Sequence, residues 1–266
     1  MTLQEAFAAR THNGKAFVPF IMAGDPDLAT TTELIVALAD SGATAVEVGV
    51  PFSDPIADGP VIQRAAERAL AQAVNMEGVL RACAAARRRV DVPLVLFTYA
   101  NPLMRYGVEK LAGQARDAGI AGVLITDMPV EHSQPIAQRL QRAGVDLIQL
   151  AAPTSTDERL QRITAAATGF IYAVSRTGIT GEQSRLSDDA ARIVGRLRRF
   201  TELPVLLGFG ISTAEQFRQA CAIADGAVIG SALVQVIAEH SGSPGLVNEV
   251  RRRVAEWTAT AAALPV

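Results

Sequence analysis

Eight short apolar segments rich in β-branched residues alternate with longer helical stretches, and this alternation constrains the fold more than any other feature. Strands that alternate with helices pair in parallel, and eight such units close into a barrel. We therefore predict an α/β protein with a (β/α)8 TIM-barrel fold, including an extra N-terminal helix and other short helices. A doubly wound open sheet is the alternative, but no G-x-G-x-x-G motif follows the first segment. The segments are residues 17–22, 44–48, 93–98, 121–126, 145–150, 169–174, 204–208 and 225–229.

Four helical stretches close on a glycine directly before the next segment, at Gly42, Gly119, Gly144 and Gly226. A glycine in this place is typical of the left-handed conformation that ends a helix. The helix-to-strand turns are therefore expected to be short. The long connections, residues 49–60 and 175–187, fall on the other side of the strands, where barrel enzymes have their active sites. Long loops at this end are candidates for a lid over the site.

The overall composition narrows the class of protein. A length of 266 residues fits one barrel domain spanning 1–266, and a formal net charge of -2 offers no basic field for nucleic acid. No apolar run reaches the roughly 18 residues that a membrane span needs. The first ten residues have an amphipathic helical pattern rather than that of a signal peptide, so we expect a cytoplasmic protein. Cys83 and Cys221 are expected to be buried thiols in a reducing compartment.

Acidic residues mark the second strand and the loop after it. Glu47 interrupts an otherwise apolar strand, and alternation points its side chain away from Val46 and Val48. A buried carboxylate is costly, so it has either a catalytic task or a structural hydrogen-bond partner. Asp54 and Asp58 follow in a loop that contains three prolines, where an aspartate can also serve only as a turn or helix cap. Two acids in different surroundings can have separated pKa values and act as acid and base.

Glycines follow the last two strands, in Leu207-Gly-Phe-Gly-Ile-Ser212 and Val228-Ile-Gly-Ser-Ala232. Backbone amides can approach an anion closely at glycine, and Ser231 begins a helix whose N-terminus favours negative charge. The loops after strands 7 and 8 commonly bind phosphate in barrels of this kind. The sequence therefore predicts a phosphate-ester substrate.

Two other reaction types lack the residues they require. A Schiff-base aldolase needs a lysine in the barrel, but Lys15 precedes the first strand and Lys110 lies in a helical stretch. A metal-dependent aldolase needs clustered ligands, whereas His12, His132 and His240 are scattered. We expect no metal, and acid–base catalysis remains as the reaction type.

Several motifs, in the same order along the chain, resemble the tryptophan synthase α subunit. The loop Pro51 to Pro60 is the most specific of them. The resemblance implies cleavage of indole-3-glycerol phosphate to indole and glyceraldehyde 3-phosphate, without a cofactor in this subunit. The matching segments are residues 17–26, 47–60, 99–102, 127–129, 176–181 and 208–212.

The resemblance also implies roles for individual residues. Glu47 corresponds to the general acid–base, and Asp58 to the carboxylate that binds the indole N–H and stabilises positive charge on the ring. Tyr172 and Thr180 correspond to residues that support this acid pair. Further positions correspond to phosphate contacts, Gly181, Gly210, Gly230 and Ser231, and to the indole pocket, Phe20, Tyr99, Leu124 and Phe209; ordinary barrel core is the alternative for the pocket residues.

A partner is implied by the resemblance alone: the pyridoxal-phosphate-dependent β subunit, in an α2β2 heterotetramer. The expected contacts are the loop around Asp54 and Pro55 and the segment 101–106. Three other functions remain open. They are a stand-alone indole-3-glycerol-phosphate lyase, a sugar-phosphate isomerase, and a catalytically silent barrel that binds and activates a β subunit. The Pro51–Pro60 motif makes the isomerase improbable, and the presence of both acids argues against the silent barrel.

Overall fold

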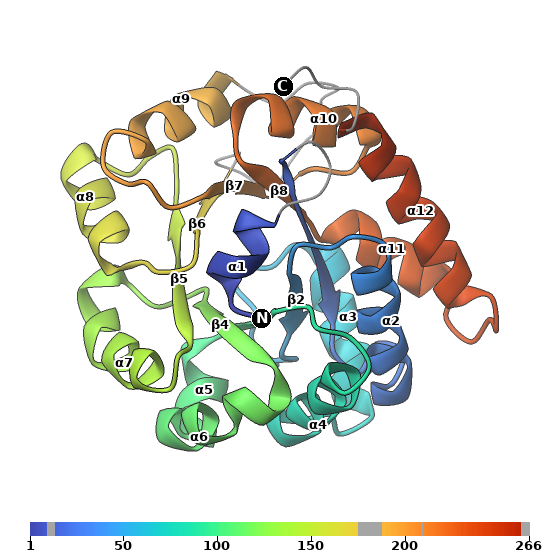
Figure 1. Ribbon diagram of the computed structural model, residues 1–266. Helices are drawn as coiled ribbons and strands as arrows, with labels where there is room; N and C mark the ends of the chain where they lie inside the picture. Colours follow the sequence, from blue (N-terminus) through green and yellow to red (C-terminus); the bar gives the residue numbers. More distant parts are fainter. Residues whose placement is uncertain (10–13, 175–187, 209, 262–266) are drawn as a thin grey trace.

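The eight predicted strands form a closed parallel barrel in chain order, with the last strand paired to the first (Figure 1). The computed structural model describes residues 1–9, 14–174, 188–208 and 210–261. The strands are β1 (Ala16–Met22), β2 (Val46–Gly49), β3 (Leu94–Thr98), β4 (Ile120–Ile125), β5 (Asp146–Ala151), β6 (Ile171–Val174), β7 (Val205–Gly208) and β8 (Gly226–Ile229). The predicted fold class is therefore confirmed.

A ring of helices surrounds the barrel, and four additional helices lie outside the regular alternation. The ring consists of α2 (Leu28–Asp40), α4 (Met76–Arg87), α6 (Val108–Ala118), α7 (Val130–Arg142), α8 (Asp157–Ala166), α9 (Asp188–Leu197), α10 (Ala214–Ile223) and α12 (Leu246–Ala261). The additional helices are α1 (Leu3–Ala8), α3 (Pro60–Ala71), α5 (Ala100–Tyr106) and α11 (Ser231–Glu239). The expected extra N-terminal and short helices are thus present.

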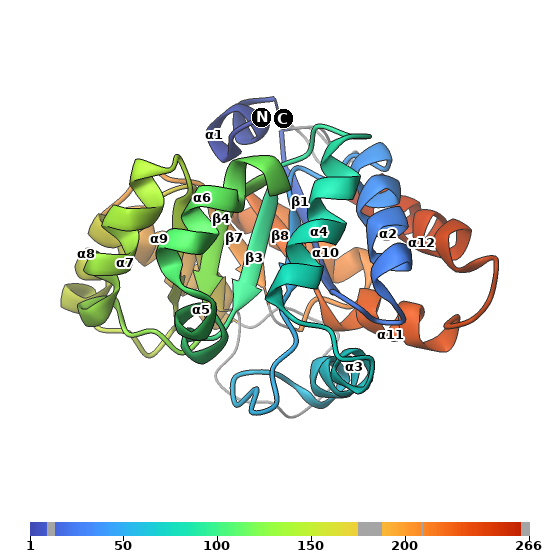
Figure 2. The same ribbon diagram turned by 90° about the horizontal axis from the view of Figure 1, so that it is seen from below.

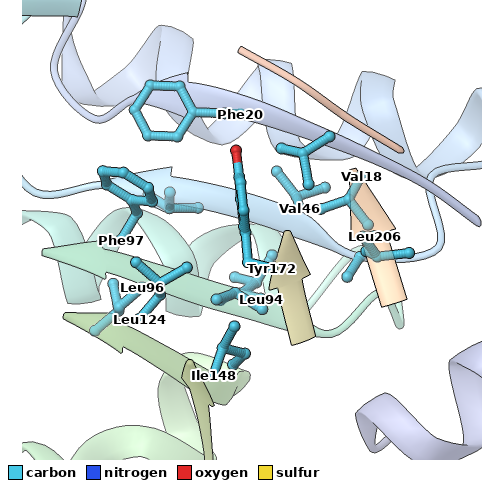
Figure 3. Packing of buried hydrophobic residues seen from close by; sticks show 14 of the residues in the cluster. Val18, Phe20, Val46, Leu94, Leu96, Phe97, Leu124, Ile148, Tyr172 and Leu206 are labelled. Carbon is cyan, nitrogen blue, oxygen red and sulfur yellow. The ribbon is translucent and has the colours of Figure 1, made fainter. Parts of the chain in front are cut away.

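Burial of both strand faces explains why the strands are almost continuously apolar. Parallel strands are covered by helices outside and by their own side chains inside, so nearly every position is removed from water. All seven residues of β1 are buried, as are all of β2, β3, β7 and β8. Figure 3 shows part of this core, with Phe20, Phe97, Leu124 and Tyr172 pointing from different strands. The rings of Phe20 and Phe97 meet edge to face with centroids 5.1 Å apart.

Helix α1 closes the amino end of the barrel. It lies across the centre of the strand ring in Figure 1 and beyond its amino end in Figure 2. The fully buried side chain of Leu3 fits against two glycines, because a Cβ at Gly122 or Gly169 would lie 3.0 or 2.8 Å from Leu3 Cδ1. Phe7 packs on Phe170 with ring centroids 5.6 Å apart. Helix α1 therefore forms an apolar floor under the barrel.

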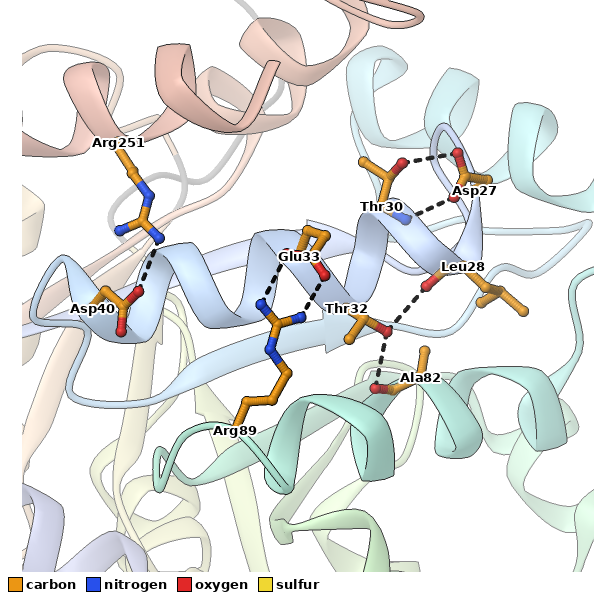
Figure 4. A network of polar contacts seen from close by, with 9 residues as sticks. All are labelled: Asp27, Leu28, Thr30, Thr32, Glu33, Asp40, Ala82, Arg89 and Arg251. Atoms are coloured by element: carbon orange, nitrogen blue, oxygen red, sulfur yellow. Dashed lines mark hydrogen bonds and ion pairs between the residues drawn. The ribbon is translucent and has the colours of Figure 1, made fainter. Parts of the chain in front are cut away.

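Polar contacts on the outer ring join α2 to its neighbours (Figure 4). Arg89, which follows α4, forms two hydrogen bonds with Glu33, and Arg251 of α12 donates to Asp40 at 2.8 Å. The Thr32 hydroxyl donates to the carbonyl of Ala82 at 3.3 Å. Exposed ion pairs of this kind contribute only about 0–1 kcal/mol each, so they set the spacing of helices more than their stability.

Three of the four predicted left-handed glycines are confirmed and one is wrong. Gly42, Gly119 and Gly144 have φ of 84°, 72° and 72° at the ends of helices. Gly226 instead begins β8, and a Cβ there would lie 2.2 Å from the carbonyl oxygen of Ala16. Gly226 is required by the close approach of two backbones at the β1–β8 pair, rather than by a helix end.

The carboxyl end of the barrel carries the functional candidates. Figure 2 shows α3 and the loop before it projecting from this end, opposite α1. No helix in the described ranges combines the length and the apolar character required to cross a bilayer.

Candidate active site

Glu47 is a carboxyl group held inside the barrel without a hydrogen-bond partner among the described residues. Its neighbours in the sheet are Phe20 of β1 and Val95 of β3. The side chain is fully buried and both carboxyl oxygens lack a partner. Burial raises the pKa of Glu47 to about 8, because the charged form loses its hydration. The structural alternative, a glutamate satisfied by its neighbours, therefore has no support in this part of the chain.

The absence of a side chain at Gly49 shapes the space beside Glu47. The two residues are two positions apart in β2 and so face the same side of the sheet. A Cβ at Gly49 would lie 2.6 Å from Cζ of Phe20, so this ring occupies the space that a side chain would fill. Phe20 thus lies at the inner edge of the same space as Glu47, as an aromatic wall.

Asp58 reaches the site from the loop between β2 and α3, and Tyr99 holds it there. The hydroxyl of Tyr99 donates a hydrogen bond to the Asp58 carboxylate and accepts one from the backbone N–H of Ala57 at 3.1 Å. The side chain of Thr126, at the end of β4, interacts with the Tyr99 hydroxyl, while its own hydroxyl donates to the carbonyl of Thr98 at 3.3 Å. Burial raises the pKa of Asp58 to about 6, and the Tyr99 hydrogen bond opposes this rise. Asp58 is therefore mostly ionised at neutral pH, unlike Glu47.

Tyr172 connects the two acids electrostatically. Its side chain is buried, and its pKa lies well above the ordinary value because of burial first and the charges of Glu47 and Asp58 second. The ring reaches from β6 across the end of β7, where a Cβ at Gly208 would lie 2.2 Å from the Tyr172 hydroxyl. The structure thus brings Tyr172 to both predicted catalytic residues.

Two neighbouring helix N-termini near the predicted phosphate site differ in how they are capped. At α10, the side chain of Gln216 accepts from the amides of Ser212 and Thr213 at 2.8 and 3.2 Å. At α11, the N-cap residue Gly230 provides no side-chain hydrogen bond. The first amides of a helix need partners and carry partial positive charge. Of the two helices, α11 therefore offers the better anion site, at Gly230 and the exposed Ser231.

The remaining predicted site residues fall into two groups. Leu124 is buried next to Phe97 in the β3–β4 pair, within the barrel core, and Gly210 is exposed after β7 with φ of 78°. Phe20 extends from Gly49 towards α11, since its Cβ lies 3.7 Å from where a Cβ at Gly230 would be. The other predicted residues, Thr180, Gly181 and Phe209, lie outside the described residues.

Sequence reasoning missed three contributors to this site. Gly49 could have been found, because alternation from Glu47 places it on the same face. The contact between Thr126 and the Tyr99 hydroxyl was not predicted, because it joins the ends of two strands that two helices separate along the chain. Asp25 and Arg68 form a buried contact 43 residues apart, with no local pattern to indicate it.

Two large apolar side chains are exposed at the same end of the molecule. Ile56, in the loop before α3, is 84% exposed, and Met104, on α5, is 56% exposed. Apart from Met1, they are the exposed large hydrophobic residues of the described ranges. Contiguous exposed apolar patches are typical of docking surfaces, whereas single exposed apolar residues are common on any protein. Both lie within or next to the segments predicted to contact a partner.

A parallel eight-stranded barrel with two carboxyl groups of separated pKa defines the class of protein: a (β/α)8-barrel enzyme. The family model described as "Tryptophan synthase alpha chain" matches residues 7–262. The chain belongs to that family. Its reaction is the cleavage of indole-3-glycerol phosphate to indole and glyceraldehyde 3-phosphate, so the chain is a carbon–carbon lyase of tryptophan biosynthesis.

Curated relatives and solved structures agree with this assignment. The tryptophan synthase alpha chain of Oceanobacillus iheyensis is 44% identical over 90% of this chain and 91% of its own length. That of Prochlorococcus marinus is 46% identical over 87% and 84%. A crystal structure of tryptophan synthase subunit alpha from Legionella pneumophila has a TM-score of 0.88, 32% identity, and coverage of 99% and 100%. A structure of the tryptophan synthase α2β2 complex from Pyrococcus furiosus has a TM-score of 0.83 at 35% identity, covering 92% and 98%.

Proposed function

We propose that the chain cleaves indole-3-glycerol phosphate with Glu47 as the general acid–base and Asp58 as the electrostatic partner. The observation that carries this proposal is the state of Glu47, an interior carboxyl whose two oxygens have no partner among the described residues and whose pKa is about 8. Such a group enters the reaction protonated. A neutral carboxylic acid next to a predominantly ionised one provides a proton donor and a counter-charge at the same pH.

The proposed steps use one proton that Glu47 gives and recovers. Glu47 donates it to C3 of the indole ring, and the resulting positive charge on the ring nitrogen is stabilised by the Asp58 carboxylate, which accepts a hydrogen bond from the N–H. The Glu47 carboxylate then removes the proton of the side-chain hydroxyl next to C3. The electron pair of the broken carbon–carbon bond returns to the ring, which gives indole, and the side chain leaves as an aldehyde. Glu47 ends protonated, as it began.

The supporting residues follow from the same geometry. Tyr99 orients Asp58 and Tyr172 borders both acids, while Phe20 and Leu124 provide apolar walls for the indole ring. The phosphate binds at the N-terminus of α11 through Gly230 and Ser231, with Gly210 beside it. Thr180, Gly181 and Phe209 remain expectations from the family resemblance.

The proposed partner is a tryptophan synthase β subunit. The related Pyrococcus furiosus chain comes from an α2β2 complex. Ile56 and Met104 support a docking surface at the carboxyl end, next to Asp54, Pro55 and the segment 101–106. Indole formed inside the barrel would then be released towards the partner.

Three further expectations complete the proposal. The chain acts as one domain and needs no cofactor of its own, whereas pyridoxal phosphate belongs to the β subunit. The protein works in the cytoplasm, where Cys83 and Cys221 stay reduced; burial raises the pKa of each thiol to about 12, which makes both unreactive.

The direct test is release of indole from indole-3-glycerol phosphate by the purified chain, with and without a β subunit, for wild type, Glu47→Gln and Asp58→Asn. We expect slow turnover alone, faster turnover with the partner, and a loss of roughly 10²–10⁴-fold in kcat for each variant. Fast turnover alone with no response to the partner would favour a stand-alone lyase. Wild-type rates in both variants would refute the mechanism, and no indole under any condition would favour the silent barrel.

A further inference from the structure

Helix α3, which begins two residues after Asp58, is only lightly held by apolar contacts. It lies outside the ring of helices, beyond the carboxyl end of the barrel (Figure 2). It packs mainly against β1 and α11, and its buried residues are Ile62 and three alanines. Because alanine buries little apolar area, this face contributes little to holding the helix in place. Other interactions therefore help to fix this helix, which follows Asp58 directly in the chain.

An ion pair with one buried partner, Asp25, supplies one such interaction. Arg68 of α3 donates from Nε to one oxygen of Asp25 at 2.8 Å and from Nη2 to the other at 2.7 Å. Asp25, in the loop after β1, is 1% exposed, while Arg68 is 38% exposed. A bidentate guanidinium–carboxylate contact fixes both distance and orientation. Loss of either partner leaves the other charge uncompensated, most severely for the buried Asp25.

Two further contacts join the same loop to the far end of α3. The side-chain amide of Gln72 donates to the carbonyl of Pro26. The backbone of Gly24 lies against Val74, where a Cβ on the glycine would be 2.5 Å from Val74 Cγ2. Together with the ion pair, these contacts link the loop after β1 to α3. Helix α3 is therefore anchored to the barrel at the end remote from Asp58.

The near end of α3 is coupled to the backbone of Asp58. The side-chain amide of Gln63 donates to the carbonyl of Asp58 at 2.8 Å, and its backbone N–H donates to Gly59 at 3.0 Å. A shift of α3 is thus passed on to Asp58, since a helix of twelve residues moves as one body. The Asp58 carboxylate would then move out of its partly buried position beside Tyr99.

We propose that Asp25 and Arg68 are positioning residues for the reaction: their ion pair sets the position of α3 and thereby the placement of Asp58 relative to Glu47. This inference rests on the proposed role of Asp58. Misplacement of a catalytic group by about 1 Å can reduce the rate by roughly 10²-fold, so a contact far from the substrate can control turnover.

The experiment compares Asp25→Asn, Arg68→Met and the double variant with wild type, using the full chain and indole-3-glycerol phosphate, alone and with a β subunit. The matched control is Arg89→Met, which removes an exposed ion pair to Glu33 on the outer ring (Figure 4). We expect each single variant to lose roughly 10–100-fold in kcat with a smaller change in KM. The double variant should be no slower than the slower single variant, because both changes break one contact. Arg89→Met should stay within about twofold of wild type.

A pH profile separates positioning from simple loss of folded protein. Within the described ranges, the titratable groups that interact with Asp58 are Tyr99, through a hydrogen bond, and Tyr172, through its charge. Burial is the largest cause of the raised pKa of Asp58, so a displaced and better hydrated Asp58 has a lower pKa. The acidic limb of kcat/KM should therefore move to lower pH in Arg68→Met and stay in place in Arg89→Met.

Three outcomes would overturn the inference: a loss of kcat that only follows the folded fraction measured by circular dichroism, an unmoved acidic limb, or additive effects in the double variant. If Arg68→Met does not fold, Arg68→Lys keeps the charge but loses the two-pronged contact. It should then show a smaller loss of kcat and a smaller shift of the same sign, and wild-type behaviour would refute the inference. Asp58→Asn distinguishes the two proposals. If Asp58→Asn is fully active, the proposed function fails; if it is inactive while the limb of Arg68→Met is unmoved, only the positioning role fails.

Discussion

The hydroxyl of Tyr99 donates a hydrogen bond to the carboxylate of Asp58, and this contact works against the burial that raises the pKa of that carboxylate. Tyr99 therefore keeps Asp58 available in its charged form at neutral pH. Glu47 has no such donor among the described residues and stays protonated to higher pH. The different pKa values of the two acids follow first from the deeper burial of Glu47 and second from the hydrogen bond that Asp58 receives.

The first prediction concerns the pH dependence of the wild-type reaction. The productive form of the free enzyme has Asp58 ionised and Glu47 protonated. Activity should rise as pH passes about 6 and fall as it passes about 8, so that kcat/KM follows a bell. The acidic limb should report Asp58 and the basic limb Glu47. A profile that rises steadily through pH 9 would contradict the acid role of Glu47.

The second prediction is that Tyr99→Phe moves the acidic limb upwards. Removal of the hydroxyl abolishes the hydrogen bond that lowers the pKa of Asp58, so this pKa rises further. We expect the acidic limb of kcat/KM to lie at higher pH than in wild type, and activity at pH 6 to fall by about tenfold. The direction is opposite to that expected for Arg68→Met, which exposes Asp58 instead. A limb that moves the same way in both variants would show that at least one assignment is wrong.

The third prediction is that Glu47→Gln changes stability only at higher pH. The folded-state pKa of about 8 exceeds the ordinary value of 4.5, so the folded state binds more protons than the unfolded state in this interval. This contribution to stability is fully present below about pH 4.5 and is lost as pH rises through about 8. Urea unfolding should therefore show that the free energy of unfolding of the variant rises relative to that of wild type between pH 5 and pH 8.5. Glu67→Gln, at an exposed site on α3, provides the control and should show no such trend.

The fourth prediction concerns the space between Gly49 and Phe20. A Cβ at Gly49 would meet the ring at 2.6 Å, so Gly49→Ala should reduce stability by about 1–3 kcal/mol and weaken substrate binding. Adding Phe20→Leu should restore part of the stability by removing the clash, while the indole slot stays impaired. Gly113→Ala in α6 is the matched control, because nothing lies within 4 Å of its Cβ. Calorimetry and KM together test this, and an unaffected KM would place the slot elsewhere.

The fifth prediction tests the phosphate site at α11. Ser231→Asp adds a negative charge where the substrate phosphate should lie, so KM should rise by about tenfold or more without loss of folding, since acids suit a helix N-terminus. Thr156→Asp adds the same charge at the N-cap of α8 and keeps a capping side chain. This control should leave KM unchanged within about twofold. Equal effects of both substitutions would indicate a general field rather than a phosphate contact.

Much of the fold was predictable because it repeats. Each of the eight strands is short, apolar and followed by a helix, so local pattern and parallel pairing lead to the same barrel. Gly226 was misread because its position before a strand resembles that of Gly42, whereas the close backbone of Ala16 explains it. A contact between β1 and β8 cannot be read from neighbours in the chain.

The site was predictable where a single residue departs from the pattern of the sequence around it. Glu47 breaks an apolar strand, and the loop containing Asp58 is rich in proline and resembles one family closely. The contact between Arg68 and Asp25 depends on where α3 lies outside the ring, which no periodicity determines. The same holds for the Tyr99 hydroxyl, whose partner is decided by the course of a loop.

Helix α1 covers the amino end of the barrel, so the two ends of the barrel differ in how they are closed. Leu3 of this helix fills the space beside two glycines, Gly122 and Gly169, at the amino end. Ile56 and Met104 are exposed at the opposite, carboxyl end. A protein docked at the carboxyl end would therefore meet a product released there before bulk solvent does.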